Sequence, residues 1–191
     1  MPLSDSGPDR VRVVADARDI RRSLTRISHE LLEHAKGSAD LVVLGIPTRG
    51  AYLARRVAAT IESIEGTPVP VGSVDPTMYR DDLRRRPTRP LLPTEMPPGG
   101  IDGKTVVLVD DVLFSGRTVR AALDALNEYG RPRAVRLAVL VDRGHRELPI
   151  RADHVGKNVT TVRGETVRVL LNEIDGMDAV ELISSPEGRA S

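Results

Sequence analysis

The sequence predicts an α/β fold in which helices flank a parallel sheet. Three short apolar runs, at residues 41–46, 105–109 and 134–141, have the pattern of strands that are buried on both faces. Amphipathic stretches with helical spacing alternate with these runs, which is typical of parallel sheets. A chain of 191 residues has room for one domain with a sizeable core.

The first half of the chain combines two helical patterns with one strong strand. A helix is expected over residues 19–36, closed by Gly37, with apolar residues every three or four positions: Ile20, Leu24, Ile27 and Leu31. After the strand at 41–46 and a turn at 47–50, a second helix ends at Gly66, with its apolar stripe at Leu53, Val57, Ile61 and Ile64. A short strand is expected near residues 69–74.

The second half begins with a long loop. Residues 79–104 carry five prolines and little apolar periodicity, and long loops inside compact domains are usually lids, binding loops or disordered segments. The strand at 105–109, a helix over residues 117–129 stopped by Gly130, and the strand at 134–141 follow. Near the C-terminus, residues 159–162 and 167–171 predict a β-hairpin.

The composition excludes several classes of protein. The absence of cysteine excludes disulfides, thiolate metal sites and cysteine nucleophiles, and no apolar run is long enough to span a bilayer. Arginine supplies 25 of the 28 basic residues, which favours bidentate phosphate binding, with coding bias as the alternative. Without a secretory signal, we expect a cytoplasmic protein with a flexible tail at 1–10, one domain at 11–185 and a C-terminal tail at 186–191.

The residues with the clearest chemistry follow the strand at 105–109. Two adjacent carboxylates, Asp110 and Asp111, stand at the strand end where open α/β sheets bind their ligands. Backbone N–H groups of residues 113–118, with the hydroxyls of Ser115 and Thr118, could hold a phosphate at the start of the next helix. Because two carboxylates would repel a phosphate, they are expected to face hydroxyls, Mg²⁺ or a developing positive charge.

The segment 106–118, Val-Val-Leu-Val-Asp-Asp-Val-Leu-Phe-Ser-Gly-Arg-Thr, resembles the motif with which type I phosphoribosyltransferases bind 5-phosphoribosyl-1-pyrophosphate (PRPP). A polar strand end that caps a helix is the alternative. The resemblance implies the type I phosphoribosyltransferase fold, a parallel sheet flanked by helices with a small hood and a long flexible loop. The implied PRPP-binding residues are Thr48, Arg49, Gly50, Arg80, Asp110, Asp111, Val112, Leu113, Phe114, Ser115, Gly116, Arg117 and Thr118.

Within that family, the chain from about residue 20 to 180 resembles the pyrimidine operon regulators that are also uracil phosphoribosyltransferases. The motifs that carry this resemblance are residues 20–30, Pro-Thr-Arg-Gly at 47–50, Tyr-Arg-Asp-Asp-Leu at 79–83, and residues 139–151. The resemblance implies transfer of the phosphoribosyl group from PRPP to uracil, which gives UMP and diphosphate. It also implies binding to the leader of a pyrimidine operon mRNA, promoted by uridine nucleotides, and a dimer or a higher assembly of dimers.

The resemblance also implies roles for the site residues. Asp110 and Asp111, the implied catalytic pair, hold the ribose hydroxyls and stabilise an oxocarbenium-like state. The turn at 48–50 is the implied diphosphate loop, commonly with a cis peptide bond in the family, and an ordinary turn is the alternative. Mg²⁺ is the implied cofactor, bound mainly through PRPP and diphosphate. The loop from Tyr79 would exclude water, with a solvated surface as the alternative for its Arg84–Arg86 cluster.

Two further surfaces are implied. Uracil is expected at Val141, Asp142 and Arg143, and an Asp142–Arg143 salt bridge without a ligand is the alternative. The implied RNA-binding residues are Arg22, Thr25, His29, Arg146, Arg151 and Lys157, with a solvated helix face as the alternative for those on the first helix. His34 stands where we expect arginine in relatives.

Three functions stay open at this point. The first is a uracil phosphoribosyltransferase that also regulates pyrimidine genes through RNA, and the second is mainly an RNA-binding regulator that uses the PRPP site as a nucleotide sensor. The third is a phosphoribosyltransferase for a purine or orotate. Core packing is the favoured alternative for Phe114, and His145 and His154 are expected to be structural or surface residues.

Overall fold

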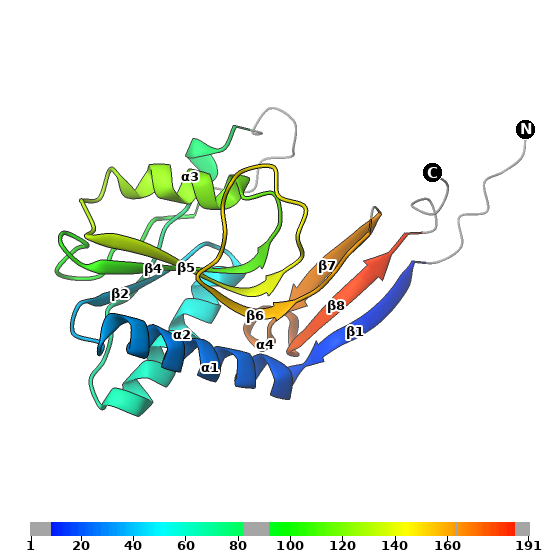
Figure 1. Cartoon of the computed structure of the whole chain (residues 1–191), viewed down its shortest axis with the longest axis horizontal. Coiled ribbons are helices and arrows are strands. Elements are labelled where there is room, and N and C mark those ends of the chain that lie inside the picture. The colour runs from blue at the N-terminus through cyan, green and yellow to red at the C-terminus, as the bar shows by residue number, and fades with distance from the viewer. Residues whose placement is uncertain (1–8, 82–91, 163, 186–191) are drawn as a thin grey trace, which may run out of the picture.

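A parallel sheet of five strands and an antiparallel sheet of three make up the computed structural model, which describes residues 9–81, 92–162 and 164–185 (Figure 1). In chain order the elements are β1 (Arg10–Asp16), α1 (Ala17–Ala35), β2 (Leu41–Gly45), α2 (Arg49–Glu65), β3 (Val71–Ser73), a 3-10 turn (Thr77–Tyr79), β4 (Thr105–Leu113), α3 (Arg117–Leu126), β5 (Ala134–Asp142), β6 (His154–Asn158), β7 (Glu165–Leu170), α4 (Asn172–Asp175) and β8 (Ala179–Ser184). The parallel sheet has the order β3–β2–β4–β5–β6.

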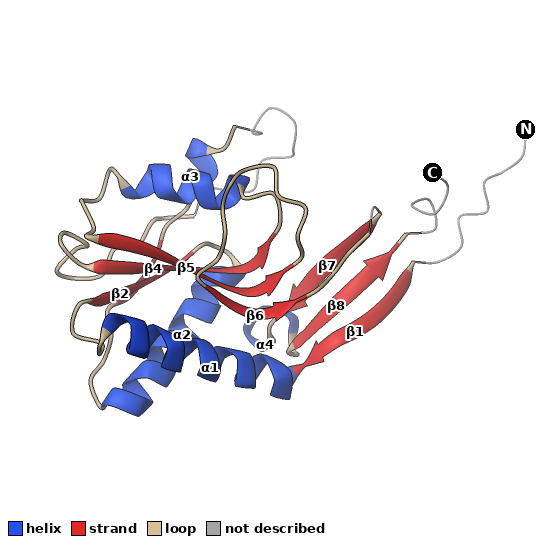
Figure 2. Cartoon of the chain, viewed as in Figure 1, coloured by secondary structure: helices blue, strands red, loops and turns tan. Residues whose placement is uncertain are grey.

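Helices cover both faces of the parallel sheet (Figure 2). Helices α1 and α2 lie on one face and α3 on the other. Neighbouring residues of a strand point to opposite faces, so Val107 belongs to the core beneath α1 and α2, and Val106 to the core beneath α3. None of the helices in the described ranges has an apolar stretch long enough to cross a membrane.

The predicted α/β fold with a parallel sheet is confirmed. The apolar runs at 41–46, 105–109 and 134–141 form β2, β4 and β5, which are neighbours in the sheet. Strand β4 continues through the acidic pair to Leu113, because its backbone still pairs with β5 there, with Leu113 opposite Asp142. Helix α3 ends at Leu126, three residues before the predicted end, and a turn follows it.

The chain order of the strands reverses between β2 and β4. Strand β3 follows β2 along the chain but lies on its other side, whereas β5 and β6 extend the sheet outward from β4. In open α/β sheets, such a reversal leaves a crevice at the carboxyl ends of the strands, and ligands bind there. The turn at 47–50 and the loop at 113–118 lie on the two sides of this point.

The predicted hairpin of residues 159–162 and 167–171 is wrong, because the antiparallel sheet pairs other strands. Strand β7 pairs with β8, and β8 with β1, so residues 167–170 have a partner from the end of the chain. Within the described ranges, residues 159–162 form no strand. Val159 and Thr161 of this segment are instead buried, and Thr161 donates a hydrogen bond to the carbonyl oxygen of Arg143. The N–H of Val159 also donates to the carbonyl oxygen of Asp142, so single backbone and side-chain contacts hold this segment where a strand ladder was predicted.

The ends of the long loop are fixed to the edge of the sheet. Ser73 and Glu95 exchange backbone hydrogen bonds, and the Asp75 carboxylate accepts one from the N–H of Leu92. Residues 82–91, which include the Arg84–Arg86 cluster, lie outside the described residues, as do residues 1–8 and 186–191 of the predicted tails. Strand β1 begins at Arg10, and the Asp16 carboxylate then caps α1 through the N–H of Asp19.

Candidate active site

Close backbone packing brings the turn at 47–50 against the acidic end of β4. A Cβ atom added to Gly50 would lie 2.4 Å from the carbonyl oxygen of Val109 and 3.2 Å from the Cα of Asp110. Only glycine permits this approach, which places the start of α2 against the acidic end of β4. The peptide bond between Pro47 and Thr48 is cis, as the resemblance implied for this loop.

A cavity of about 560 Å³, the first cavity, opens at the carboxyl end of β4. Its lining residues are Arg80, Asp81, Asp110, Val112, Leu113, Phe114, Ser115, Gly116, Arg117, Thr118, Val119, Arg143 and Glu147. The structure therefore brings together most of the predicted PRPP-binding residues and one predicted uracil-binding residue. Thr48–Gly50, Asp111, Val141 and Asp142 are not part of this lining.

The two carboxylates of the acidic pair have different surroundings. Asp110 is 7% exposed and lines the first cavity, whereas Asp111 is half-buried and is not among the residues that line this cavity. Each accepts a hydrogen bond from the next backbone N–H in the chain, Asp110 from Asp111 at 2.9 Å and Asp111 from Val112 at 2.8 Å. These local bonds fix the direction of both side chains.

The loop after β4 turns tightly at the start of α3. Gly116 adopts φ +92°, a left-handed conformation that favours glycine, and it is the N-cap of the helix. The first N–H groups of a helix have no acceptor within the helix, so they are available to an anion. The carbonyl oxygen of Ser115 accepts hydrogen bonds from Glu147 and Leu148, which join this turn to the loop after β5.

Arginine side chains connect the walls of the first cavity. Arg80 donates a hydrogen bond to the Thr118 hydroxyl at 2.7 Å. Arg117 bridges Asp81 and Glu147, with a distance of 2.6 Å to each carboxylate. The hydrogen bond to Glu147, together with the charge of Asp81, raises the pKa of Arg117. These contacts join the long loop, α3 and the loop after β5 around the cavity.

Arg143 and Phe114 form a stacked pair on the wall of the cavity. The Arg143 guanidinium carbon lies 4.3 Å from the centre of the Phe114 ring, and Nη2 donates to the carbonyl oxygen of Glu165 at 2.6 Å. Burial lowers the pKa of Arg143, and its Nε is buried without an acceptor among the described residues. Phe114 is 37% exposed, so the expectation of core packing was wrong. This pair therefore adds a planar cation and a partly exposed aromatic ring to the lining of the first cavity.

The other predicted uracil-binding residues have structural contacts. Val141 is fully buried within β5. The Asp142 carboxylate pairs with Arg146 and accepts from the N–H of Gly144, so the salt bridge weighed for Asp142 and Arg143 does not form. A second cavity of about 560 Å³ lies beside this loop and is lined by Asp142–Arg146, Arg151 and Asn158–Thr161.

The predicted RNA-binding residues lie mainly on α1 and β6. Arg22, Thr25 and His29 are exposed on α1, and Lys157 is exposed on the neighbouring strand β6. Arg26 joins these elements, because its Nη2 donates to the carbonyl oxygens of Val155 and Gly156. Arg151 is exposed in the loop before β6. Arg146 differs, since its guanidinium also donates to the carbonyl oxygens of Phe114 and Ile150 within the chain.

His154 is a structural residue, as expected. It is 1% exposed, and its Nδ1 lies 3.0 Å from Oε2 of Glu30. Burial raises the pKa of Glu30, but hydrogen bonds from His154 and Arg26 outweigh it, so the pKa is lowered overall. The His34 ring lies 5.2 Å from the His154 ring, beside a smaller cavity of about 220 Å³.

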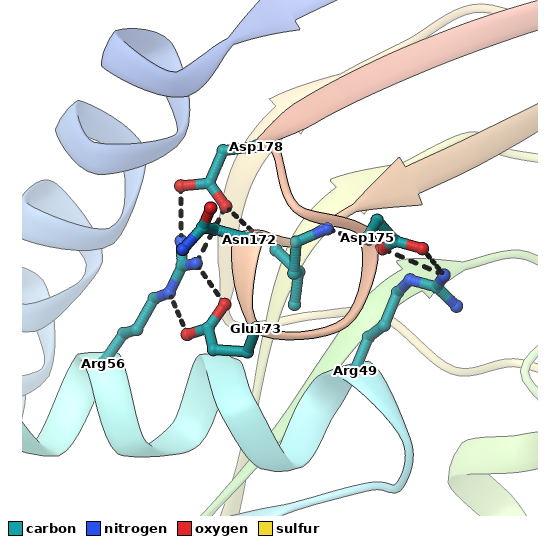
Figure 3. Close-up of polar contacts among 7 residues, drawn as sticks. Arg49, Arg56, Asn172, Glu173, Asp175 and Asp178 are labelled. Carbon is teal, nitrogen blue, oxygen red and sulfur yellow. Dashed lines mark hydrogen bonds and ion pairs between the residues drawn. The ribbon is translucent and has the colours of Figure 1, made fainter.

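Sequence reasoning missed several contacts of the site. Asp81 and Glu147 hold Arg117, and Asp175 holds Arg49 through Nη2 at 3.1 Å (Figure 3). Asp81 and Glu147 belong to strings that carry the resemblance, but nothing in those strings identifies their partner. Among the described residues, no group of three or more His, Cys, Asp or Glu side chains could hold a metal ion.

Comparisons with known proteins agree with this geometry. The family model described as a phosphoribosyl transferase domain matches residues 13–172. The bifunctional protein PyrR of Streptomyces coelicolor is 66% identical over 175 residues, which cover 92% of this chain and 91% of that protein. The bifunctional protein PyrR of Leifsonia xyli is 64% identical over 176 residues, covering 90% of this chain and 96% of that protein. The hypoxanthine phosphoribosyltransferase of Trypanosoma cruzi has a TM-score of 0.68 at 16% identity, covering 91% of this chain and 97% of that one, so it shares the fold.

Proposed function

The chain belongs to the phosphoribosyl transferase family, and from this premise we propose that it is a uracil phosphoribosyltransferase that also regulates pyrimidine genes by binding RNA. The observation that carries the proposal is the first cavity, which combines a carboxylate, an anion-binding turn and a stacked arginine. These groups match the three parts of the product UMP, which are a ribose, a phosphate and a flat base. The bifunctional relatives support the regulatory half.

In the proposed complex, the turn at 114–118 binds the 5-phosphate of PRPP. Its support is the start of α3, where backbone N–H groups and the positive end of the helix dipole favour a dianion. The Ser115 and Thr118 hydroxyls add donors, and Thr118 is already aligned by Arg80. Thr48, Arg49 and Gly50 hold the diphosphate at the other side of the acidic pair.

The acidic pair stabilises the charge that develops during transfer. The bond from the ribose C1 to the diphosphate oxygen breaks, the bond from C1 to N1 of uracil forms, and N1 gives up its proton. Positive charge grows on the ribose as the diphosphate leaves, and fixed carboxylates at Asp110 and Asp111 favour it. Their local hydrogen bonds support this role, because the side chains need no rearrangement when the charge appears.

Uracil binds beside Arg143 and Phe114 in this proposal. The Arg143 guanidinium would donate to a uracil carbonyl oxygen, and the Phe114 ring supplies a stacking surface, because both residues line the first cavity. Val141 and Asp142 contribute indirectly, because their backbone and ion pair hold the loop that carries Arg143.

Magnesium and assembly belong to the same proposal. The carboxylates of the acidic pair suit Mg²⁺, but the described residues lack a cluster that could hold the ion alone, so oxygen atoms of PRPP would supply most ligands. When bound, Mg²⁺ neutralises charge on the leaving diphosphate. The proposed partners are PRPP, uracil, UMP, a pyrimidine operon mRNA leader and a second copy of the chain, in the cytoplasm, where nucleotides and mRNA occur together.

A steady-state assay of diphosphate release from PRPP and Mg²⁺ tests the enzymatic half. Uracil, orotate, hypoxanthine and adenine are compared as acceptors, and uracil alone is expected to turn over. Turnover of a purine or of orotate would contradict the base assignment. If no base reacts but UMP still binds, the protein is instead an RNA regulator that senses nucleotides through this site. Filter binding of leader RNA with and without UMP then tests the regulatory half, with tighter binding expected in the presence of UMP.

A further inference from the structure

Arg49 in the proposed diphosphate turn is held by a carboxylate from near the end of the chain (Figure 3). Its Nη2 donates to both carboxylate oxygens of Asp175, at 3.1 and 3.2 Å. Its Nε is buried, and no acceptor for it exists among the described residues. A buried N–H group without an acceptor is unfavourable, so the Asp175 ion pair leaves one donor of this guanidinium unsatisfied in the structure.

Asp175 is itself fixed by the chain around it. Its Oδ2 accepts a hydrogen bond from the N–H of Leu171 at 2.8 Å, and its own N–H donates to the Leu171 carbonyl oxygen at 2.7 Å. Leu171 is fully buried, which anchors this turn to the core. The hydrogen bond from the Leu171 N–H lowers the pKa of Asp175 most. Burial opposes this effect, and the hydrogen bond and charge of Arg49 lower the pKa further. An ionised carboxylate therefore stands at a defined place beside Arg49.

Arg56, two turns further along α2, provides the contrast. Its Nε, Nη1 and Nη2 make four hydrogen bonds to Glu173 and Asp178, at 2.5 to 2.9 Å. All three of its nitrogen atoms have partners, and Asp178 also accepts from the N–H of Asn172 at 2.8 Å. Arg56 thus attaches α4 to α2 without any contribution from Arg49. The Asp175 pair is not needed for that attachment.

Arg49 belongs to the turn that is proposed to bind the diphosphate. Arg49 follows the cis peptide bond and precedes Gly50, which packs against the acidic end of β4. Guanidinium groups bind phosphate oxygens through several parallel hydrogen bonds, and a guanidinium that is already oriented loses less freedom on binding. We propose that Asp175 is a positioning residue for the diphosphate, because its ion pair with Nη2 holds the Arg49 guanidinium in place for a phosphate group of PRPP. This inference rests on the proposed function.

The test replaces Asp175 by asparagine. The Asp175→Asn side chain has one carbonyl oxygen, which cannot accept from Leu171 and Arg49 as two carboxylate oxygens do. We expect KM for PRPP and Kd for diphosphate to rise about five- to tenfold, as for the loss of one oriented charged contact. The turnover number should stay within about twofold and KM for uracil unchanged, since neither the acidic pair nor Arg143 is altered.

Asp178→Asn is the matched control. It removes an acceptor of Arg56 on the same surface, so it should lower Tm and leave KM for PRPP at the wild-type value. Combining Asp175→Asn with Arg49→Gln should raise KM no further than Arg49→Gln alone, because both act through one guanidinium. Thermal unfolding of every variant separates loss of folding from loss of binding.

Three outcomes would overturn the inference. They are wild-type KM and Kd in Asp175→Asn, an equal rise in Asp178→Asn, and additive effects in the double variant. Calorimetric binding of PRPP and diphosphate with Mg²⁺ needs no base. If the wild-type protein binds PRPP but does not use uracil, the proposed activity is refuted, and the binding measurements still test the role of Asp175. If the wild-type protein binds neither PRPP nor diphosphate, the proposed activity and the role of Asp175 are both refuted.

Discussion

Gly50→Ala tests whether close packing of the diphosphate turn on β4 sets the geometry of the site. The added Cβ would lie 2.4 Å from the Val109 carbonyl oxygen, and this separation must grow to at least 3.0 Å, so the start of α2 must move away from β4. Overpacking of this kind costs about 1–3 kcal/mol of unfolding free energy. For a chain of this size, each kcal/mol lowers Tm by about 2–4 °C.

The larger effect is expected on catalysis. The movement separates the diphosphate turn from Asp110, and a misplacement of about 1 Å can reduce a rate about 100-fold. We expect kcat/KM for PRPP to fall between about tenfold and 100-fold in the diphosphate-release assay, with the variant still folded by circular dichroism.

Gly66→Ala, at the other end of α2, is the matched control for this prediction. No atom lies within 4 Å of the added Cβ, but φ is +73°, so the change should cost about 1–2 kcal/mol of stability without altering kcat/KM. A wild-type kcat/KM in Gly50→Ala, or an equal loss of kcat/KM in Gly66→Ala, would show that packing of the turn on β4 does not set the geometry of the site.

Three further predictions address other parts of the site. Asp110→Asn and Asp111→Asn should each lower kcat on the order of 100-fold with little change in Tm, because they remove the charge that is proposed to stabilise the ribose in the transition state, and an unchanged kcat in both would contradict that role. Arg143→Lys should raise KM for uracil about tenfold and leave KM for PRPP unchanged, since lysine lacks the planar donor edge, and steady-state kinetics with each substrate varied decides this. Hydrogen bonds from Arg56 lower the pKa of Glu173 and of Asp178. The two ionised carboxylates therefore stabilise the folded state fully above their ordinary pKa values of 4.5 and 3.8. This stabilisation is lost as the pH falls through the lower pKa values of the folded state. Urea unfolding of the wild type and of Asp178→Asn between pH 3 and 7 measures this effect. The free energy of unfolding should fall less at low pH in the variant than in the wild type.

The central strands could be predicted because their environment is visible in local sequence. Strands β2, β4 and β5 are buried on both faces, so each is a continuous apolar run. Strand β6, with the sequence His-Val-Gly-Lys-Asn, lies at the edge of the sheet and has no such run. Strand β1 pairs with β8, whose residues lie at the other end of the chain, and no local pattern identifies that partner. The false hairpin arose because residues 159–162 are all Val or Thr, which favour strands, whereas the structure places them in a loop that buries only Val159 and Thr161.

In the site, too, residues that are neighbours in the sequence could be predicted and partners that are distant in the sequence could not. The acidic pair and the turn at 114–118 are contiguous, so a single motif predicts both. The partners that orient its arginines are distant in sequence, as with Arg49 and Asp175, which are separated by 126 positions. Such pairs are set by the packing of α4 on α2, which one sequence does not reveal. Arg146 shows the same limit, since it was predicted from the resemblance to bind RNA and the structure adds contacts to the Phe114 and Ile150 carbonyl oxygens.

A crystal structure of the protein with UMP and Mg²⁺ would locate the phosphate, the ribose and the base in one measurement. We expect the phosphate at residues 114–118, the ribose hydroxyls at Asp110 and Asp111, and the base against Arg143 and Phe114. UMP bound instead in the second cavity, beside Arg151 and away from the acidic pair, would show that the first cavity is not the nucleotide site.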